Sequence, residues 1–141
     1  MTTTIPIKLL SIDNDGFHLL AVLKINNKKA LVIIDTGASR SVFDKERIKR
    51  FVKTRSKKIK DKLSTGLGTN TMESHHVKID SITIGKLKLK DYATVLLDLS
   101  HVNNSYRQLG LAEIDGVLGS DILHRYKAVI DYKKAALKLS S

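Results

Sequence analysis

An acidic residue stands where an apolar segment of the chain ends. Residues 31–34 read Leu-Val-Ile-Ile, and Asp35-Thr36-Gly37-Ala38-Ser39 follows directly. Small residues allow a sharp turn at this point, which directs the carboxylate of Asp35 out of the core. The tripeptide Asp-Thr-Gly is also compatible with an ordinary turn, in which the aspartate bonds to the backbone two residues later. A carboxylate in this position can act as a general acid or base.

Two further segments stand out downstream. Gly66-Leu67-Gly68-Thr69 is a turn-rich tip between strand-like segments, although an ordinary glycine turn has the same composition. Gly116-Val117-Leu118-Gly119 is apolar and bounded by glycines, and residues 120–126 after it are expected to form a short helix capped at Ser120.

The elements that must position these segments are mostly strands. Apolar or alternating patterns predict strands at residues 5–10, 17–25, 30–34, 77–84, 86–90, 92–97, 116–119, 128–131 and 135–139. Residues 30–34 are apolar on both faces, which predicts burial on both sides. Asp44 is expected to cap a short helix whose apolar face holds Ile48, Phe51 and Val52. Residues 100–113 are polar and are expected to form a surface loop with one helical turn at 105–109.

Length and composition indicate one domain that spans residues 1–141. With 42% hydrophobic residues, a chain of 141 residues can fill a hydrophobic core without disulfide bonds or a structural metal. It has no cysteine, which excludes a disulfide framework, thiolate metal sites and a cysteine nucleophile. No apolar run approaches the roughly 20 residues that span a bilayer, so no membrane partner is expected. We expect a cytoplasmic protein.

The chain is basic, with 25 Lys and Arg against 14 Asp and Glu and a formal net charge of +11. Nine of the Lys and Arg residues lie between Arg47 and Lys62, with one aromatic residue, Phe51, among them. Because nucleic-acid binding surfaces commonly interleave charge with stacking aromatics, this run is more typical of a solvated face, and a nucleic-acid partner is not expected. His75 and His76 are adjacent in an expected strand and point to opposite faces, so no metal site is predicted.

Taken in series, the segments at Asp35, Gly66 and Gly116 resemble those of the retropepsin-like aspartic proteases of the pepsin clan, in their cellular form. The resemblance covers most of the chain and matches the family in order and spacing. It implies an all-β fold, a closed half-barrel with one or two short helices. It also implies a two-fold homodimer, since one chain carries half of an active site.

The resemblance implies an aspartic endopeptidase that needs no metal or cofactor. In that reading Asp35, Thr36 and Gly37 are the catalytic residues, and a water is activated between the Asp35 carboxylates of the two chains. Ala38 and Ser39 would line the floor of the substrate site. The tip formed by Gly66, Leu67 and Gly68 would act as a flap over an extended peptide or protein substrate.

Two positions depart from the viral members of this family. Ser39 and Ser120 stand where viral enzymes commonly carry an Asp and an Arg that form an ion pair within the subunit. Because both partners are absent, no buried charge is orphaned. An alternative of a different class stays open, a catalytically silent dimeric module of the same fold that grips an extended peptide or an acidic partner.

Overall fold

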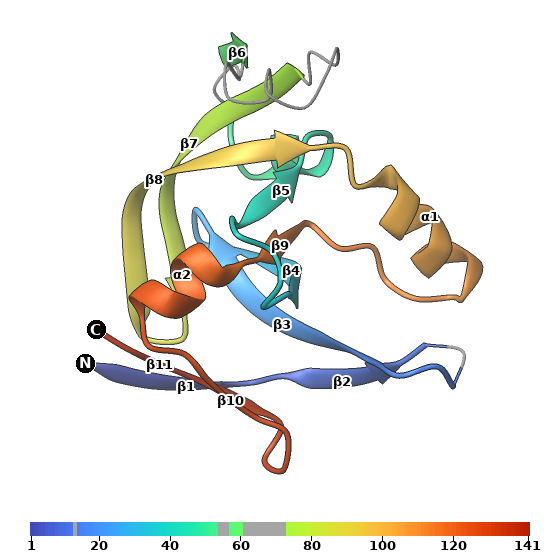
Figure 1. Cartoon of the computed structure of the whole chain (residues 1–141). Coiled ribbons are helices and arrows are strands. Elements are labelled where there is room, and N and C mark those ends of the chain that lie inside the picture. The colour runs from blue at the N-terminus through green and yellow to red at the C-terminus, as the bar shows by residue number, and fades with distance from the viewer. Residues whose placement is uncertain (13, 54–56, 61–72) are drawn as a thin grey trace.

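Six strands of the computed structural model close into a barrel (Figure 1). The structure describes residues 1–12, 14–53, 57–60 and 73–141. Around the barrel the strands pair in the order β3-β4-β9-β5-β8-β7, and β7 closes the ring by pairing with β3. The strands are β1 (Thr2–Pro6), β2 (Lys8–Ser11), β3 (Phe17–Ile25), β4 (Lys28–Ile34), β5 (Val42–Asp44), β6 (Lys57–Lys60), β7 (Glu73–Ile84), β8 (Leu87–Leu97), β9 (Gly116–Leu118), β10 (Val129–Asp131) and β11 (Ala136–Ser140).

Strand β4, which leads to the Asp35 loop, forms a hairpin with β3. Asn26 and Asn27 make the turn with φ values of 49° and 69°, a region that asparagine tolerates better than most residues. Val32 is fully buried, whereas Leu31 and Ile33 on the opposite face are only partly buried. The prediction that this strand is buried on both sides therefore holds for one face only.

Strands β7 and β8 form a long antiparallel pair that keeps one register from His75–Leu96 to Ile84–Leu87, on both sides of Asp91. The separate strands predicted at residues 86–90 and 92–97 are one strand, β8, so the implied break at Asp91 is wrong. Asp91 has a φ of 54°, which matches its turn-like residue type, yet the pairing continues on both sides of it. The predicted break at Gly85 is confirmed as the turn between the two strands, with a φ of 61°.

Asp44 joins two helical segments to the end of β5. Its Oδ2 atom accepts hydrogen bonds from the backbone N–H groups of Glu46 and Arg47 (3.2 and 2.9 Å), at the start of the 3-10 helix η1 (Arg47–Arg50). Its Oδ1 atom accepts one from Leu99 N–H (2.8 Å), directly before α1. Asp44 thus bonds to the start of the helix, but Glu46 occupies the N-cap position predicted for Asp44, and the helix that follows is a short 3-10 helix.

Helix α1 (Ser100–Gln108) occupies the segment expected to be a loop with one helical turn. Buried Tyr106 packs with Leu20 and Ile114 in a second apolar cluster outside the barrel core. Asn103 exchanges hydrogen bonds with the backbone of Ile114, at 2.7 Å to its N–H and 3.1 Å to its carbonyl. These tertiary contacts extend the helix beyond its local signal. No described helix is long and apolar enough to span a membrane.

A separate three-stranded sheet, ordered β1-β11-β10, brings the two termini side by side (Figure 1). The predicted hairpin of the last two strands is confirmed, and β1 adds to its far side in antiparallel register. Helix α2 (Ser120–Arg125) confirms the second predicted helix. The predicted fold class, an all-β closed barrel with short helices, is therefore confirmed.

Candidate active site

The loop that carries Asp35 begins where β4 ends. The backbone N–H of Asp35 donates to the carbonyl of Leu118 (3.0 Å), so β9 holds the loop at its first residue. The N–H of Gly37 donates to Oδ1 of Asp35 (2.9 Å), which orients the carboxylate. Asp35, Thr36 and Gly37 are all exposed. The loop therefore presents a fixed carboxylate on the surface.

Glycines let β9 and the start of α2 approach this loop closely. A Cβ atom added to Gly119 would lie 2.7 Å from the carbonyl carbon and oxygen of Arg40, and one added to Gly116 would lie 2.5 Å from Cδ1 of Phe43. The N–H of Ser120 donates to the carbonyl of Ala38 (2.7 Å). The glycine-bounded segment is thus packed directly beneath the Asp35 loop, and larger residues at its ends would push the loop away.

A second carboxylate holds the far end of the loop. Oδ1 of Asp121 accepts hydrogen bonds from both the N–H and the hydroxyl of Ser41 (2.8 Å each), and its Oδ2 accepts one from the hydroxyl of Tyr92. The Ser41 hydroxyl oxygen in turn accepts a bond from Gly119 N–H (2.8 Å). We call Ser41, Tyr92 and Asp121 the Asp121 cluster. It connects the loop to β8 and α2 at one point.

Hydrogen bonding fixes the ionisation of this cluster. Burial alone would raise the pKa of Asp121, but the donors Tyr92 and Ser41 outweigh it and lower that pKa below its usual range. Burial, together with the bond to Asp121, raises the pKa of Tyr92 well above its ordinary value. At neutral pH Asp121 is therefore ionised and Tyr92 is a neutral donor.

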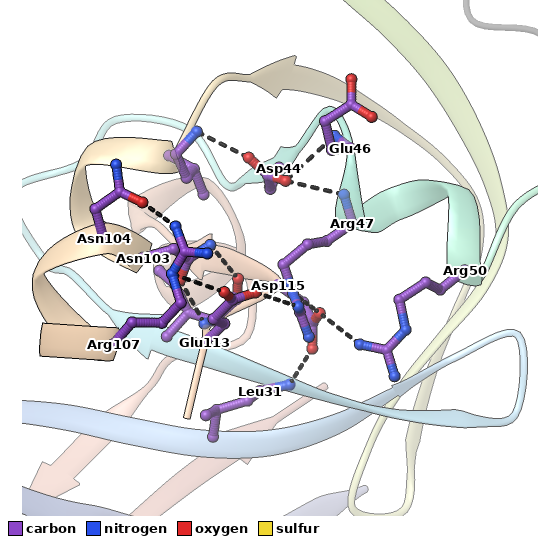
Figure 2. Close-up of polar contacts among 12 residues, drawn as sticks. Leu31, Asp44, Glu46, Arg47, Arg50, Asn103, Asn104, Arg107, Glu113 and Asp115 are labelled. Carbon is purple, nitrogen blue, oxygen red and sulfur yellow. Dashed lines mark hydrogen bonds and ion pairs between the residues drawn. The ribbon is translucent and has the colours of Figure 1, made fainter. Parts of the chain in front are cut away.

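A group of ion pairs lies around the residues that directly precede β9 (Figure 2). Arg47 pairs through Nε with Oδ1 of Asp115 (2.7 Å) and through Nη1 with Oε2 of Glu113 (2.6 Å). Arg107 of α1 also reaches Glu113, at 3.1 Å. We call Arg47, Arg107, Glu113 and Asp115 the Arg47 cluster. It joins η1 and α1 to the strand beneath the loop.

Asp115 is the buried member of the Arg47 cluster and also contacts β4. Its Oδ2 accepts a hydrogen bond from Leu31 N–H (2.8 Å), and its own N–H donates to the carbonyl of Leu31 (2.7 Å). The side chain of Asp115 therefore continues the parallel pairing of β4 and β9 by one residue. This contact sets the position of β9 before it reaches Asp35.

The structure brings the first group of predicted site residues together. Asp35, Thr36, Gly37, Ala38 and Ser39 form one continuous loop, and all but the partly buried Ala38 are exposed. The predicted flap residues Gly66, Leu67 and Gly68 lie outside the described residues. The roles assigned to both groups stay predictions.

Sequence reasoning missed Ser41, Tyr92 and Asp121, although Asp121 lies in the segment expected to form the second helix. Its three hydrogen bonds come from two other parts of the chain, so no local pattern indicated them. The one available signal was its place two residues after Gly119. Arg47 and Asp115 were missed for the same reason.

Comparisons with known proteins show the family and the fold of the chain. A family model described as aspartyl protease matches residues 21–122. A comparison with curated proteins finds no match.

Three solved structures share the fold. A retropepsin-like aspartic protease from Rickettsia conorii is 24% identical, with a TM-score of 0.60 over 99% of this chain and 92% of that one. The retroviral protease-like domain of Ddi1 from Leishmania major is 18% identical, with a TM-score of 0.58 over 86% of this chain and 87% of that one. EIAV protease, in complex with the inhibitor HBY-793, is 21% identical, with a TM-score of 0.51 over 82% of this chain and 93% of that one. The retropepsin-like fold predicted from the sequence is confirmed.

Proposed function

The chain belongs to the aspartyl protease family, and on that premise we propose that two copies of it form one active site that hydrolyses peptide bonds. The observation that carries this proposal is the exposed Asp35 carboxylate, which Gly37 N–H orients on a loop fixed at both ends. One chain supplies one Asp-Thr-Gly segment. A two-fold axis beside this loop would supply the second carboxylate.

Two carboxylates are needed because they share a proton. A few Å apart they cannot both stay ionised, so the pair titrates as a unit with one proton between them. The ionised carboxylate takes a proton from a water, whose oxygen attacks the peptide carbonyl carbon. The protonated carboxylate gives its proton to the carbonyl oxygen, which yields a tetrahedral intermediate. Proton transfer to the leaving nitrogen then completes hydrolysis.

The remaining loop residues would bind and position. Thr36 is exposed beside Asp35, where its hydroxyl can hydrogen-bond across the axis to the partner's loop. The backbone of Gly37 and the side chains of Ala38 and Ser39 would face an extended peptide. The segment Gly66-Leu67-Gly68 would close over that peptide as a flap.

Digestion of a peptide library tests the reaction. We expect the wild-type protein to cleave peptides and Asp35→Asn to lose all measurable cleavage while it keeps its fold. Asp80→Asn is the matched control, because Asp80 is an exposed carboxylate on β7 away from the loop. Cleavage by Asp35→Asn at the wild-type rate would remove Asp35 from the mechanism. A wild-type dimer that cleaves no peptide would instead support the silent binding module.

A mixing experiment tests whether the site is shared. After subunit exchange between equal amounts of wild-type and Asp35→Asn chains, only pairs of wild-type chains are active. Activity should then be about a quarter of that of the same total amount of wild-type protein. A value of about one half would mean that single chains act alone.

Thr36→Ala tests the axis itself. Without the hydroxyl bond across the axis, the dimer should dissociate about tenfold more readily, a change measured by sedimentation at several concentrations. At saturating protein concentration its cleavage rate should return toward the wild-type value. An unchanged dissociation constant would contradict the role assigned to Thr36.

A further inference from the structure

An open groove of ≈ 440 Å³ lies on the outer face of β3 and β4, beside the segment that joins β1 to β2. Its floor is apolar and includes Leu20, Val22 and Leu31. Val22 is 52% exposed and lies in the middle of β3. We call this surface the β3–β4 groove.

The strand register places lysines at both ends of the β3–β4 groove. Lys8 lies opposite Leu20 at one end, and Lys29 lies opposite Lys24 at the other. Leu20 and Lys24 are four residues apart on β3, which corresponds to about 13 Å along an extended strand. The groove is therefore an apolar strip with a positive charge at each end.

These lysines are not neutralised within the described part of the chain. No Asp or Glu lines the groove, and none of the ion pairs among the described residues involves Lys8, Lys24 or Lys29. Like charges directly opposite each other on paired strands, as at Lys24 and Lys29, are unfavourable. An anionic partner would relieve that repulsion and cover the exposed valine.

We propose that the β3–β4 groove docks a peptide segment of another protein that carries apolar residues flanked on both sides by Asp or Glu. The apolar residues lie over Val22, and the flanking carboxylates pair with Lys8 at one end and with Lys24 and Lys29 at the other. The net charge of +11 adds long-range attraction for such a segment. The groove is a site distinct from the Asp35 loop, and binding to it does not depend on catalysis.

Other anionic partners fit the groove less well. A lipid with one headgroup would satisfy the lysines at one end and leave those at the other unpaired. A nucleic acid would lack stacking partners, because no aromatic side chain lines the groove. Positive charge at both ends of an apolar strip matches a peptide whose apolar centre is flanked on both sides by acidic residues.

Fluorescence anisotropy tests the proposal with a labelled peptide of sequence Asp-Glu-Leu-Val-Leu-Glu-Asp. The protein is the full chain with Asp35→Asn, so that cleavage does not interfere. Lys24→Glu/Lys29→Glu should weaken binding by about tenfold or more. Lys45→Glu/Lys90→Glu makes the same charge change at exposed lysines outside the groove and should weaken it far less. Val22→Gln should weaken binding without any change in charge.

Several outcomes would overturn the proposal. If both lysine pairs weaken binding equally and Val22→Gln has no effect, the peptide senses only the overall charge. An oligouridylate or anionic vesicles that bind as well, with the same dependence on Val22, would exclude the peptide specificity. Absence of binding at low salt would exclude the docking site while leaving the proposed protease activity untouched.

Discussion

The Asp121 cluster and the Arg47 cluster lie at opposite ends of β9, and they hold it in different ways. In the Asp121 cluster one anion accepts bonds from the neutral donors of Ser41 and Tyr92, and one of these residues belongs to the loop of Asp35. In the Arg47 cluster oppositely charged side chains pair directly. They join η1 and α1 to the residues that precede β9. We infer that the Asp121 cluster positions the Asp35 loop, whereas the Arg47 cluster attaches the helical segments to the barrel.

The largest expected effect is a loss of stability in Asp115→Ala with little loss of activity. Asp115→Ala removes the buried anion, leaves Leu31 N–H without its acceptor, and takes a partner from Arg47, so it should lower the free energy of unfolding by about 3 kcal/mol. Urea unfolding measures this loss. Cleavage per folded chain should change little at low temperature. A large loss of activity in fully folded protein would contradict this expectation, because the Arg47 cluster would then also position the loop.

Asp121→Asn should affect activity more than stability, unlike Asp115→Ala. The amide keeps one acceptor for Ser41, so the loss in unfolding free energy is about 1–2 kcal/mol, whereas cleavage per folded chain falls because the loop is less constrained. The pKa of Asp121 is lowered in the folded state, so its ionised form stabilises the fold above the unfolded pKa of about 3.9. The stability difference from wild type should therefore be present at pH 7 and vanish as the pH falls through the folded pKa. A difference that grows in acid would contradict this sign.

Tyr92→Phe makes a smaller change in the same Asp121 cluster. It removes one of the bonds that lower the pKa of Asp121, so that pKa should rise toward its usual value. The expected cost is about 1 kcal/mol in unfolding free energy. NMR titration of the Asp121 carboxyl carbon measures the shift. An unchanged titration would mean that Ser41 alone sets the ionisation.

The smallest effect belongs to the exposed edge of the Arg47 cluster. Arg107 is 60% exposed, so Arg107→Gln should cost about 0.5 kcal/mol or less, and the cost should disappear in high salt. Unfolding measured at two salt concentrations tests this. A larger loss that persists in high salt would show that α1 depends on this ion pair for its docking.

Local patterns in the sequence predicted most of the barrel. Strand β3 spans the residues expected from its apolar pattern, and the Asp35 loop follows β4 as its small residues indicate. Helix α1 was underestimated because its sequence is polar, and its length depends on the burial of Tyr106 and the bonds of Asn103 to Ile114. These partners are distant or backbone contacts that a sequence window does not contain.

Asp91 and Asp121 show the same limit at single positions. Asp91 has the residue type and the positive φ of a turn, yet the pairing of β7 with β8 carries the strand through it. Asp121 has the residue type of a helix start, yet it also bonds to Ser41 and Tyr92. At both positions the local propensity of the residue is correct. The continued strand and the distant hydrogen bonds come from tertiary contacts, which local propensity does not specify.

The pairing of β1 with β11 has a consequence for how the chain folds. Residues 2–6 find their partners at residues 136–140, and Ser141 N–H also bonds to the carbonyl of Met1 (2.8 Å). Contacts between such distant residues cost the most loop entropy and form late. During synthesis β1 stays unpaired until residues 136–140 have been made. A strand that is translated before β2 to β10 is thus among the last of this domain to be secured.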